Sequence, residues 1–193
     1  KEVKMAPDNL SPKLLEKYIN LPISASTLSR MVSQKQINGD NIKSYEEVME
    51  ESYRMYINDH KKVWIKFFEI LLRSNKRPII FHCSAGKDRT GIASFMIQSI
   101  FNNHIDKIFE NYLISNDLLT IKAATAEQKT NSSKQDTQVT KNMLSTLGKV
   151  QTSYLNAAID EIEKKYSSLE NYFISQLGLK HNDIQKIKQI FGN

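Results

Sequence analysis

The chain has 193 residues, a formal net charge of +6 and a single cysteine, Cys83. This length suits one domain, so residues 1–193 are expected to fold as a unit. One cysteine excludes an intramolecular disulfide, and no apolar run is long enough for stable membrane insertion. The lysines are scattered and form no basic block, which argues against a nucleic-acid partner, while the net charge favours anionic partners. Because no signal peptide is visible, a cytoplasmic or secreted location is expected.

The predicted elements of the first half, in chain order, begin with weak patterns. Residues 1–7 fit a short strand, and residues 9–24 fit a short helix between two prolines. Apolar side chains at helical spacing then predict a long or broken helix over about 45–74. The run RPIIFHC, residues 77–83, has the signature of a short buried strand behind a proline.

The second half is predicted to be helical around one polar segment. Helices are expected at 90–101 and 105–117, directly after the strand and the turn that follows it. The polar residues 119–140 are interpreted as a loop or a lid over the loop at Cys83. Three helices close the chain, the second opened by a capping box from Ser167 to Glu170. Their expected ranges are 149–166, 168–179 and 182–191.

The predicted strand decides the fold class. A buried strand needs neighbours on both sides, since a lone strand leaves its backbone hydrogen-bonding groups unpaired. Its partners are expected either upstream of Lys1 or within residues 1–40. The sequence therefore predicts an α/β fold, with a central sheet flanked by helices and helix-rich in this chain.

The loop between that strand and the next helix, HCSAGKDRTG, has the composition of a phosphate cradle. Consecutive backbone N–H groups can curl around one anion at the positive end of a helix dipole. The residues that would supply them are Ser84, Ala85, Gly86, Lys87, Asp88 and Arg89. Cys83 lies at the base of this cradle, where the same field would stabilise a thiolate and lower the pKa of the thiol.

A purely structural role for Cys83 explains fewer of the residues in this loop. A lone cysteine at the end of a strand is usually a small buried hydrophobe. That view accounts for neither Arg89, which can grip two phosphoryl oxygens, nor the glycines Gly86 and Gly91, which leave room for the ring and the helix start. A nucleotide-binding P-loop is excluded, because Phe81 stands at its first glycine and an aspartate follows Lys87.

The loop resembles the signature of cysteine-dependent tyrosine and dual-specificity phosphatases. Its GKDRTG form is similar to a bacterial atypical family of tyrosine and phosphoinositide phosphatases, and the helices ENYLISND and YLNAAIDEIEKKYSSLENYFISQLGL support the likeness. The resemblance covers about residues 45–193. It implies a phosphatase domain whose upstream strands precede the loop.

The chemistry expected is two-step phosphomonoester hydrolysis without metal or cofactor. Cys83 attacks phosphorus, the loop amides and Arg89 hold the transition-state charge, and water releases phosphate. His82 either tunes Cys83 or is a buried histidine bonded to a backbone carbonyl. Thr90 hydrogen-bonds the sulfur or caps the helix. Lys87 either faces the loop mouth, where it would recognise extra phosphates, or is a solvated lysine.

Asp88 is the candidate general acid. If its side chain points out over the rim, it meets the leaving oxygen, and a bound phosphate dianion would favour its protonated form. The resembling family is thought to use its loop aspartate in this way. The alternative is that Asp88 pairs with Lys87 or another lysine and only fixes the loop.

Substrates and rival functions stay open at this point. A phosphorylated protein, carrying phosphotyrosine or phosphoserine and phosphothreonine, or a phosphoinositide would suit the cradle. The rivals are a phosphate-binding pseudophosphatase and a sulfur-transfer or arsenate-reducing enzyme, although no second cysteine is present to resolve an intermediate. The pattern predicts no oligomeric state.

Overall fold

A computed structural model describes residues 10–24, 45–127 and 148–192 of the chain, without the side chains of Tyr45 and of residues 119–127. All regular elements in these ranges are α-helices, and the expected helical half is confirmed. They are α2 (Pro12–Leu15), α4 (Tyr45–Asn58), α5 (Lys61–Arg73), α6 (Asp88–Ile100), α7 (Ile105–Glu127), α9 (Thr152–Tyr166), α10 (Leu169–Ser175) and α11 (His181–Phe191).

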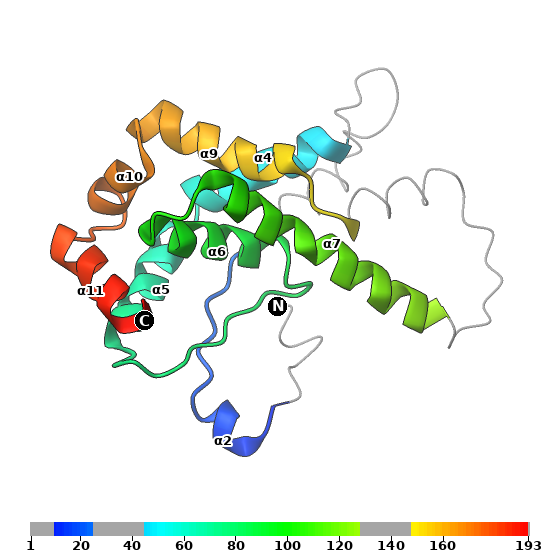
Figure 1. Cartoon of the computed structure of the whole chain (residues 1–193), viewed down its shortest axis with the longest axis horizontal. Coiled ribbons are helices and arrows are strands. Elements are labelled where there is room, and N and C mark those ends of the chain that lie inside the picture. Colours follow the sequence, from blue (N-terminus) through cyan, green and yellow to red (C-terminus); the bar gives the residue numbers. More distant parts are fainter. Residues whose placement is uncertain (1–9, 25–44, 128–147, 193) are drawn as a thin grey trace.

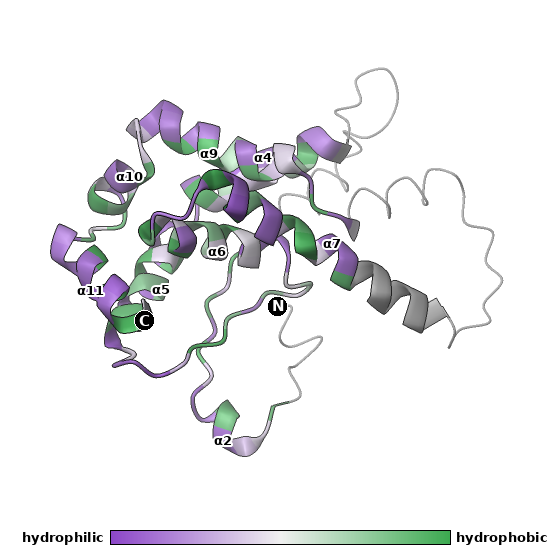
Figure 2. Ribbon diagram, in the orientation of Figure 1, coloured by the Kyte–Doolittle hydropathy of each residue, from purple (hydrophilic) through white to green (hydrophobic). Residues whose placement is uncertain are grey.

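The helices pack around one hydrophobic core. Helix α4 lies along α9, α10 returns against α9, and α6 lies beside α7 (Figure 1). Helix α11 closes the core by packing against α5 and α6. Figure 2 shows polar residues on the outer turns of α9, α10 and α11, while the more apolar α6 lies among the other helices. No helix in the described ranges is long and apolar enough to cross a membrane.

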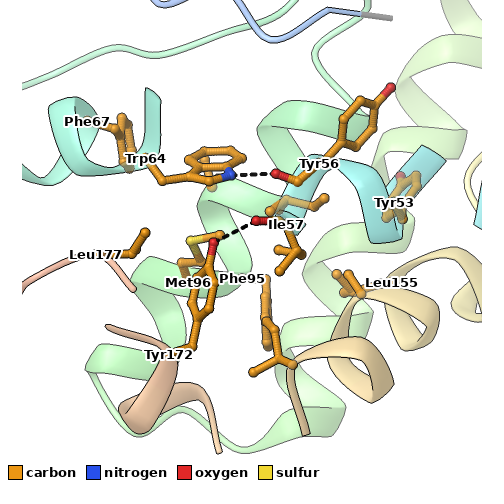
Figure 3. Packing of buried hydrophobic residues seen from close by; sticks show 14 of the residues in the cluster. Tyr53, Tyr56, Ile57, Trp64, Phe67, Phe95, Met96, Leu155, Tyr172 and Leu177 are labelled. Atoms are coloured by element: carbon orange, nitrogen blue, oxygen red, sulfur yellow. Dashed lines mark hydrogen bonds between the residues drawn. The ribbon is translucent and has the colours of Figure 1, made fainter. Parts of the chain in front are cut away.

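The predicted helix over 45–74 is broken into α4 and α5. The last carbonyl groups of a helix lack partners within it, and here buried side chains supply them. The Trp64 indole N–H donates to the Tyr56 carbonyl oxygen at 2.7 Å, and the Tyr172 hydroxyl donates to the Ile57 carbonyl oxygen at 3.0 Å (Figure 3). The break is therefore fixed inside the core.

Residues 77–83 do not form the expected buried strand among the described residues. The segment is extended, but it belongs to no strand, and the Ile80 side chain is 90 % exposed. The physical reason is the absence of any neighbouring strand in the described ranges, so the backbone of this segment has no strand to pair with, although Ile79 and Phe81 pack against the helical core. In Figure 1 it runs beneath α6 toward the start of that helix, and the segment after α2 also lies on this side. The expected strand at 1–7 lies outside the described residues, and the central sheet stays a prediction.

Two further expectations need correction. Helix α7 continues to Glu127, so residues 119–127 are helical and do not form a loop, while the lid over the loop at Cys83 stays a prediction because residues 128–140 lie outside the described ranges. The capping residue of α10 is Ser168, whose hydroxyl accepts from the Asn171 N–H at 3.1 Å. Ser167 instead ends α9 in the left-handed conformation, with φ of 65°, which displaces the predicted cap by one residue.

Candidate active site

Cys83 lies at the end of the extended segment, directly before the turn that enters α6. Its side chain is half-buried, and burial by itself raises the pKa of the thiol. That effect is outweighed by the Thr90 hydroxyl, the backbone N–H groups of Thr90 and Gly86, and the charge of Arg89, which together lower the pKa below its ordinary value. The loop thus stabilises a thiolate.

Thr90 contributes through an unusual contact. Its hydroxyl oxygen is buried and has no partner of regular hydrogen-bond geometry among the described residues. The hydroxyl nevertheless lies beside the Cys83 sulfur and lowers the pKa of the thiol. The contact therefore stabilises a thiolate electrostatically and is not a regular hydrogen bond.

The two loop glycines have different structural reasons. Gly86 has φ of 70°, a left-handed conformation that side chains disfavour, and the turn over the sulfur requires it. Gly91 lies in the first turn of α6, where a Cβ would fall 2.8 Å from two carbons of the Tyr112 ring on α7. Glycine at this position therefore permits the close approach of α6 and α7.

Arg89 is oriented by a distant part of the chain. One guanidinium N–H donates to the Ile23 carbonyl oxygen at 2.9 Å, in the extended segment after α2. His60, at the start of α5, is also nearby: burial lowers the pKa of this histidine, and the Arg89 charge lowers it further against the opposing effect of Asp59. The Arg89 guanidinium therefore interacts with the segment after α2 and with the start of α5, as well as with the Cys83 thiol.

Lys87 occupies neither of the positions predicted for it. It is 5 % exposed, and its ammonium group donates to the Lys149 carbonyl oxygen at 3.2 Å. The same nitrogen lies 3.6 Å from Oδ2 of Asp88. Lys87 therefore neither faces the loop mouth nor extends into solvent, because a buried ammonium group needs these polar partners.

Asp88 is directed into the protein and not over the rim. Its Oδ1 accepts a hydrogen bond from the Tyr53 hydroxyl at 2.9 Å, and its Oδ2 faces Lys87. The side chain is 17 % exposed. The lysine pair that the alternative interpretation of Asp88 required is present, and α4 adds a second partner that the sequence pattern did not suggest.

Tyr53 and Tyr112 extend this contact into the core. Their hydroxyl oxygens lie 2.6 Å apart, and both side chains are buried. Burial raises the pKa of Tyr53 well above its ordinary value, and the negative charge of Asp88 raises it further. Both phenols therefore stay protonated and can donate hydrogen bonds.

The remaining predicted residues lie at the surface of the loop. The Nδ1 atom of His82 lies 3.0 Å from the Cys83 carbonyl oxygen, the backbone contact that one alternative expected, but the side chain is exposed and not buried. Ser84 and Ala85 are exposed at the loop tip. Within the described ranges, no group of three or more histidine, cysteine, aspartate or glutamate side chains could hold a metal ion.

Sequence reasoning missed the residues that hold the loop from outside. The residues in question are the Ile23 carbonyl, Tyr53, Tyr112 and the Lys149 carbonyl, which lie between 21 and 66 residues from their partners in the chain. Two of these contacts use backbone carbonyls, which every residue carries, so no sequence signal could have found them. The tyrosines fall on apolar helix faces, where an aromatic ring is ordinarily part of the core.

Several known proteins are similar in sequence to this chain. The chain is 22% identical to a tyrosine-protein phosphatase of Nostoc commune, over 94% of this chain and 61% of the relative. It is 26% identical to the triple specificity protein phosphatase PtpB of Mycobacterium tuberculosis, over 86% of this chain and 64% of that protein. It is 32% identical to an inositol diphosphatase of Saccharomyces cerevisiae, over 37% of this chain and 25% of the relative.

The chain spans less than two thirds of the length of each of these relatives. A match that covers the chain itself comes from the family comparison, in which residues 1–192 fit the tyrosine phosphatase family. Together with the thiol-centred loop at the start of α6, this match shows that the chain belongs to the tyrosine phosphatase family.

Proposed function

We propose that the chain hydrolyses phosphomonoesters through a phosphocysteine intermediate on Cys83. The observation that carries the proposal is the lowered pKa of this half-buried thiol, together with its place against the N–H groups of Gly86 and Thr90 at the start of α6. A site that stabilises a thiolate in this way also suits a phosphoryl group, since both are anions.

In the first step the Cys83 thiolate attacks phosphorus, and the bond to the leaving oxygen breaks. The loop amides from Ser84 to Arg89 and the Arg89 guanidinium hold the phosphoryl oxygens as negative charge develops on them. In the second step water attacks the phosphocysteine, inorganic phosphate leaves, and the thiolate returns. The Thr90 hydroxyl eases this departure because it stabilises the sulfur anion.

Asp88 is the proposed donor of the proton that the leaving oxygen requires. Its support is its place directly before Arg89 and the resemblance of the loop to a family with a catalytic loop aspartate. Its carboxylate faces Tyr53 and Lys87. In the proposal, Oδ1 keeps its contact with Tyr53 while Oδ2 turns from Lys87 toward the leaving oxygen when substrate fills the cradle.

Phosphotyrosine proteins are the first proposed substrates, with phosphoserine and phosphothreonine proteins next. The support is membership of the tyrosine phosphatase family and the likeness to a triple specificity protein phosphatase. Phosphoinositides are the second candidate, favoured by the likeness to an inositol diphosphatase and by the net charge of +6. The buried Lys87 gives this second candidate no support, because its ammonium group is already bound inside the protein.

The rival functions predict different chemistry from the same loop. A pseudophosphatase would bind phosphoproteins without turnover, yet the nucleophile and the arginine are both in place. A sulfur-transfer or arsenate-reducing enzyme would need a thiol or sulfur donor to complete its cycle, and this chain holds one cysteine. Turnover of a simple phosphate ester separates these functions.

The test is hydrolysis of para-nitrophenyl phosphate by the whole chain and by Cys83→Ser. We expect the wild type to release nitrophenol and phosphate in equal amounts, and the serine variant to lose at least about a thousandfold in kcat/KM. Equal activity of the two proteins would overturn the proposal. A panel of phosphopeptides and phosphoinositides with the wild type then ranks the two substrate classes.

A further inference from the structure

We infer that Tyr53 and Tyr112 are positioning residues that hold the Asp88 carboxyl group at the start of α6. The inference rests on the proposed function, because it assigns these tyrosines to the proton-transfer step of the same reaction. It goes beyond the loop itself, since the two residues lie 35 positions before Asp88 and 24 positions after it in the chain, on α4 and α7.

The hydrogen bonds form a directed chain. A phenol has one hydrogen to donate, and Tyr53 gives it to Oδ1 of Asp88 at 2.9 Å. The Tyr53 oxygen is then the acceptor in its 2.6 Å contact with Tyr112, so the Tyr112 hydroxyl is the donor. Tyr112 therefore orients the Tyr53 hydroxyl, and Tyr53 orients the carboxylate.

Burial makes this arrangement rigid. Tyr53 is fully buried and Tyr112 is 5 % exposed, so neither hydroxyl can exchange its partner for water. The rings of Tyr53 and Tyr112 meet edge to face, with centroids 6.5 Å apart and planes at 78°. The Tyr154 ring also packs against the Tyr53 ring, with centroids 5.8 Å apart. A buried hydroxyl without a partner is unfavourable, which favours one arrangement of these hydroxyl groups over any rotated one.

The opposite side of the carboxyl group is held as well. Oδ2 of Asp88 lies 3.6 Å from the Lys87 ammonium group, which is itself tied to the Lys149 carbonyl oxygen. The carboxyl group thus lies between a neutral phenol and a cation. Of these two contacts, only the one with Tyr53 can be removed without changing a residue of the loop, because Lys87 belongs to that loop.

Gly91 belongs to the same unit. A Cβ at this position would meet the Tyr112 ring at 2.8 Å, closer than real Cβ atoms approach other heavy atoms. The glycine of the loop therefore makes room for the ring whose hydroxyl begins the hydrogen-bond chain. A role in core packing alone would explain the rings, but phenylalanine would fill the same space. Only the Tyr53 hydroxyl reaches Asp88, and the Tyr112 hydroxyl reaches Tyr53.

The experiment removes one hydroxyl at a time in the full chain. Tyr53→Phe and Tyr112→Phe are compared with Tyr172→Phe, which removes another buried hydroxyl that donates to a backbone carbonyl at 3.0 Å and does not touch Asp88. For each variant, kcat/KM is measured on one aryl phosphate with a good leaving group and one with a poor leaving group. Only a change in proton donation affects the two substrates unequally.

We expect Tyr53→Phe to lose about tenfold more on the poor leaving group than on the good one, with a smaller unequal loss for Tyr112→Phe. Tyr172→Phe should change both substrates equally. In an Asp88→Asn background, Tyr53→Phe should cause no further unequal loss, because the group that it positions is gone.

Two results would overturn the inference and leave the proposed function intact: equal losses on both substrates for Tyr53→Phe in an active protein, or an unequal loss that persists in the Asp88→Asn background. A wild-type chain that hydrolyses no aryl phosphate would instead overturn the proposed function and, with it, this inference. Circular dichroism of each variant shows whether it is folded, and Tyr112→Phe provides the same comparison if Tyr53→Phe fails to fold.

Discussion

The helical body and the loop before α6 are held in place by different forces. In the body, Trp64 and Tyr172 lie among apolar side chains and also bind the last carbonyl groups of α4. In the loop, Ser84 to Gly86 are exposed, and the turn is fixed by polar contacts from elements far away in the chain. The body therefore supplies stability, whereas the loop depends on the body for its geometry.

This contrast predicts that variants of the loop change the reaction more than the stability, and that variants of the body do the opposite. Substitutions at the boundary between the two regions should change both.

After the loss expected for Cys83→Ser, the largest effect is expected for Arg89→Lys. Lysine keeps the charge, but it cannot donate to the Ile23 carbonyl oxygen and to a phosphoryl group in the fixed fork of a guanidinium. We expect kcat/KM for para-nitrophenyl phosphate to fall about 10²–10³-fold. Arg73→Lys, at an exposed arginine at the end of α5, is the matched control and should leave the rate unchanged. Arg89→Lys activity within threefold of wild type would contradict the role of this side chain.

Gly91→Ala tests the boundary between loop and body. Because the added methyl group would meet the Tyr112 ring at 2.8 Å, we expect a loss of about 1–3 kcal/mol in the free energy of unfolding and reduced activity. Urea denaturation measures the first quantity. Gly148→Ala is the control, since a Cβ there has no heavy atom within 4 Å. Equal stability of the two variants would show that α6 and α7 are not closely packed at this glycine.

Trp64→Phe is expected to weaken the body alone. The variant leaves the buried Tyr56 carbonyl oxygen without its indole donor, so the free energy of unfolding should fall by about 1–3 kcal/mol. The kcat/KM of the folded protein should stay within about twofold of wild type, because the indole does not touch the loop. A large loss of activity at unchanged stability would reverse the assignment of this residue.

The smallest effect concerns the thiol. Because the pKa of Cys83 is lowered, more thiolate is present at pH 6 than in a free cysteine, and iodoacetate should alkylate Cys83 faster. Thr90→Ala removes the hydroxyl beside the sulfur, so the pKa should rise and the alkylation rate at pH 6 should fall several-fold. The lowered pKa would be contradicted if wild-type Cys83 reacted no faster than a free thiol.

The sequence predicted well those features that depend on local pattern. Helical periodicity located α4, α5 and α6 because each buries one stripe of apolar side chains, as Phe67, Phe68 and Leu71 do on α5. The candidate active-site loop could be predicted because its residues lie within a few positions of one another in the chain. The shift from Ser167 to Ser168 at the cap of α10 shows the ordinary error of one residue at helix ends.

The parts that failed depend on distant partners. The expected burial of residues 77–83 requires neighbouring strands, and Ile80 is exposed where the described ranges contain none. The inward direction of Asp88 and Lys87 depends on Tyr53 and on the Lys149 carbonyl oxygen, contacts that only the packing of α4 and of the segment before α9 creates. A pattern read along the chain carries no information on such contacts.

The most direct test of the proposed chemistry is an acid quench of the wild-type chain during steady turnover of para-nitrophenyl phosphate, followed by mass spectrometry of its peptides. The account predicts one added phosphoryl group on the peptide that contains Cys83, absent before substrate is added and lost as substrate is consumed. Continued release of phosphate while Cys83 stays unmodified, or a phosphoryl group on another residue, would contradict it.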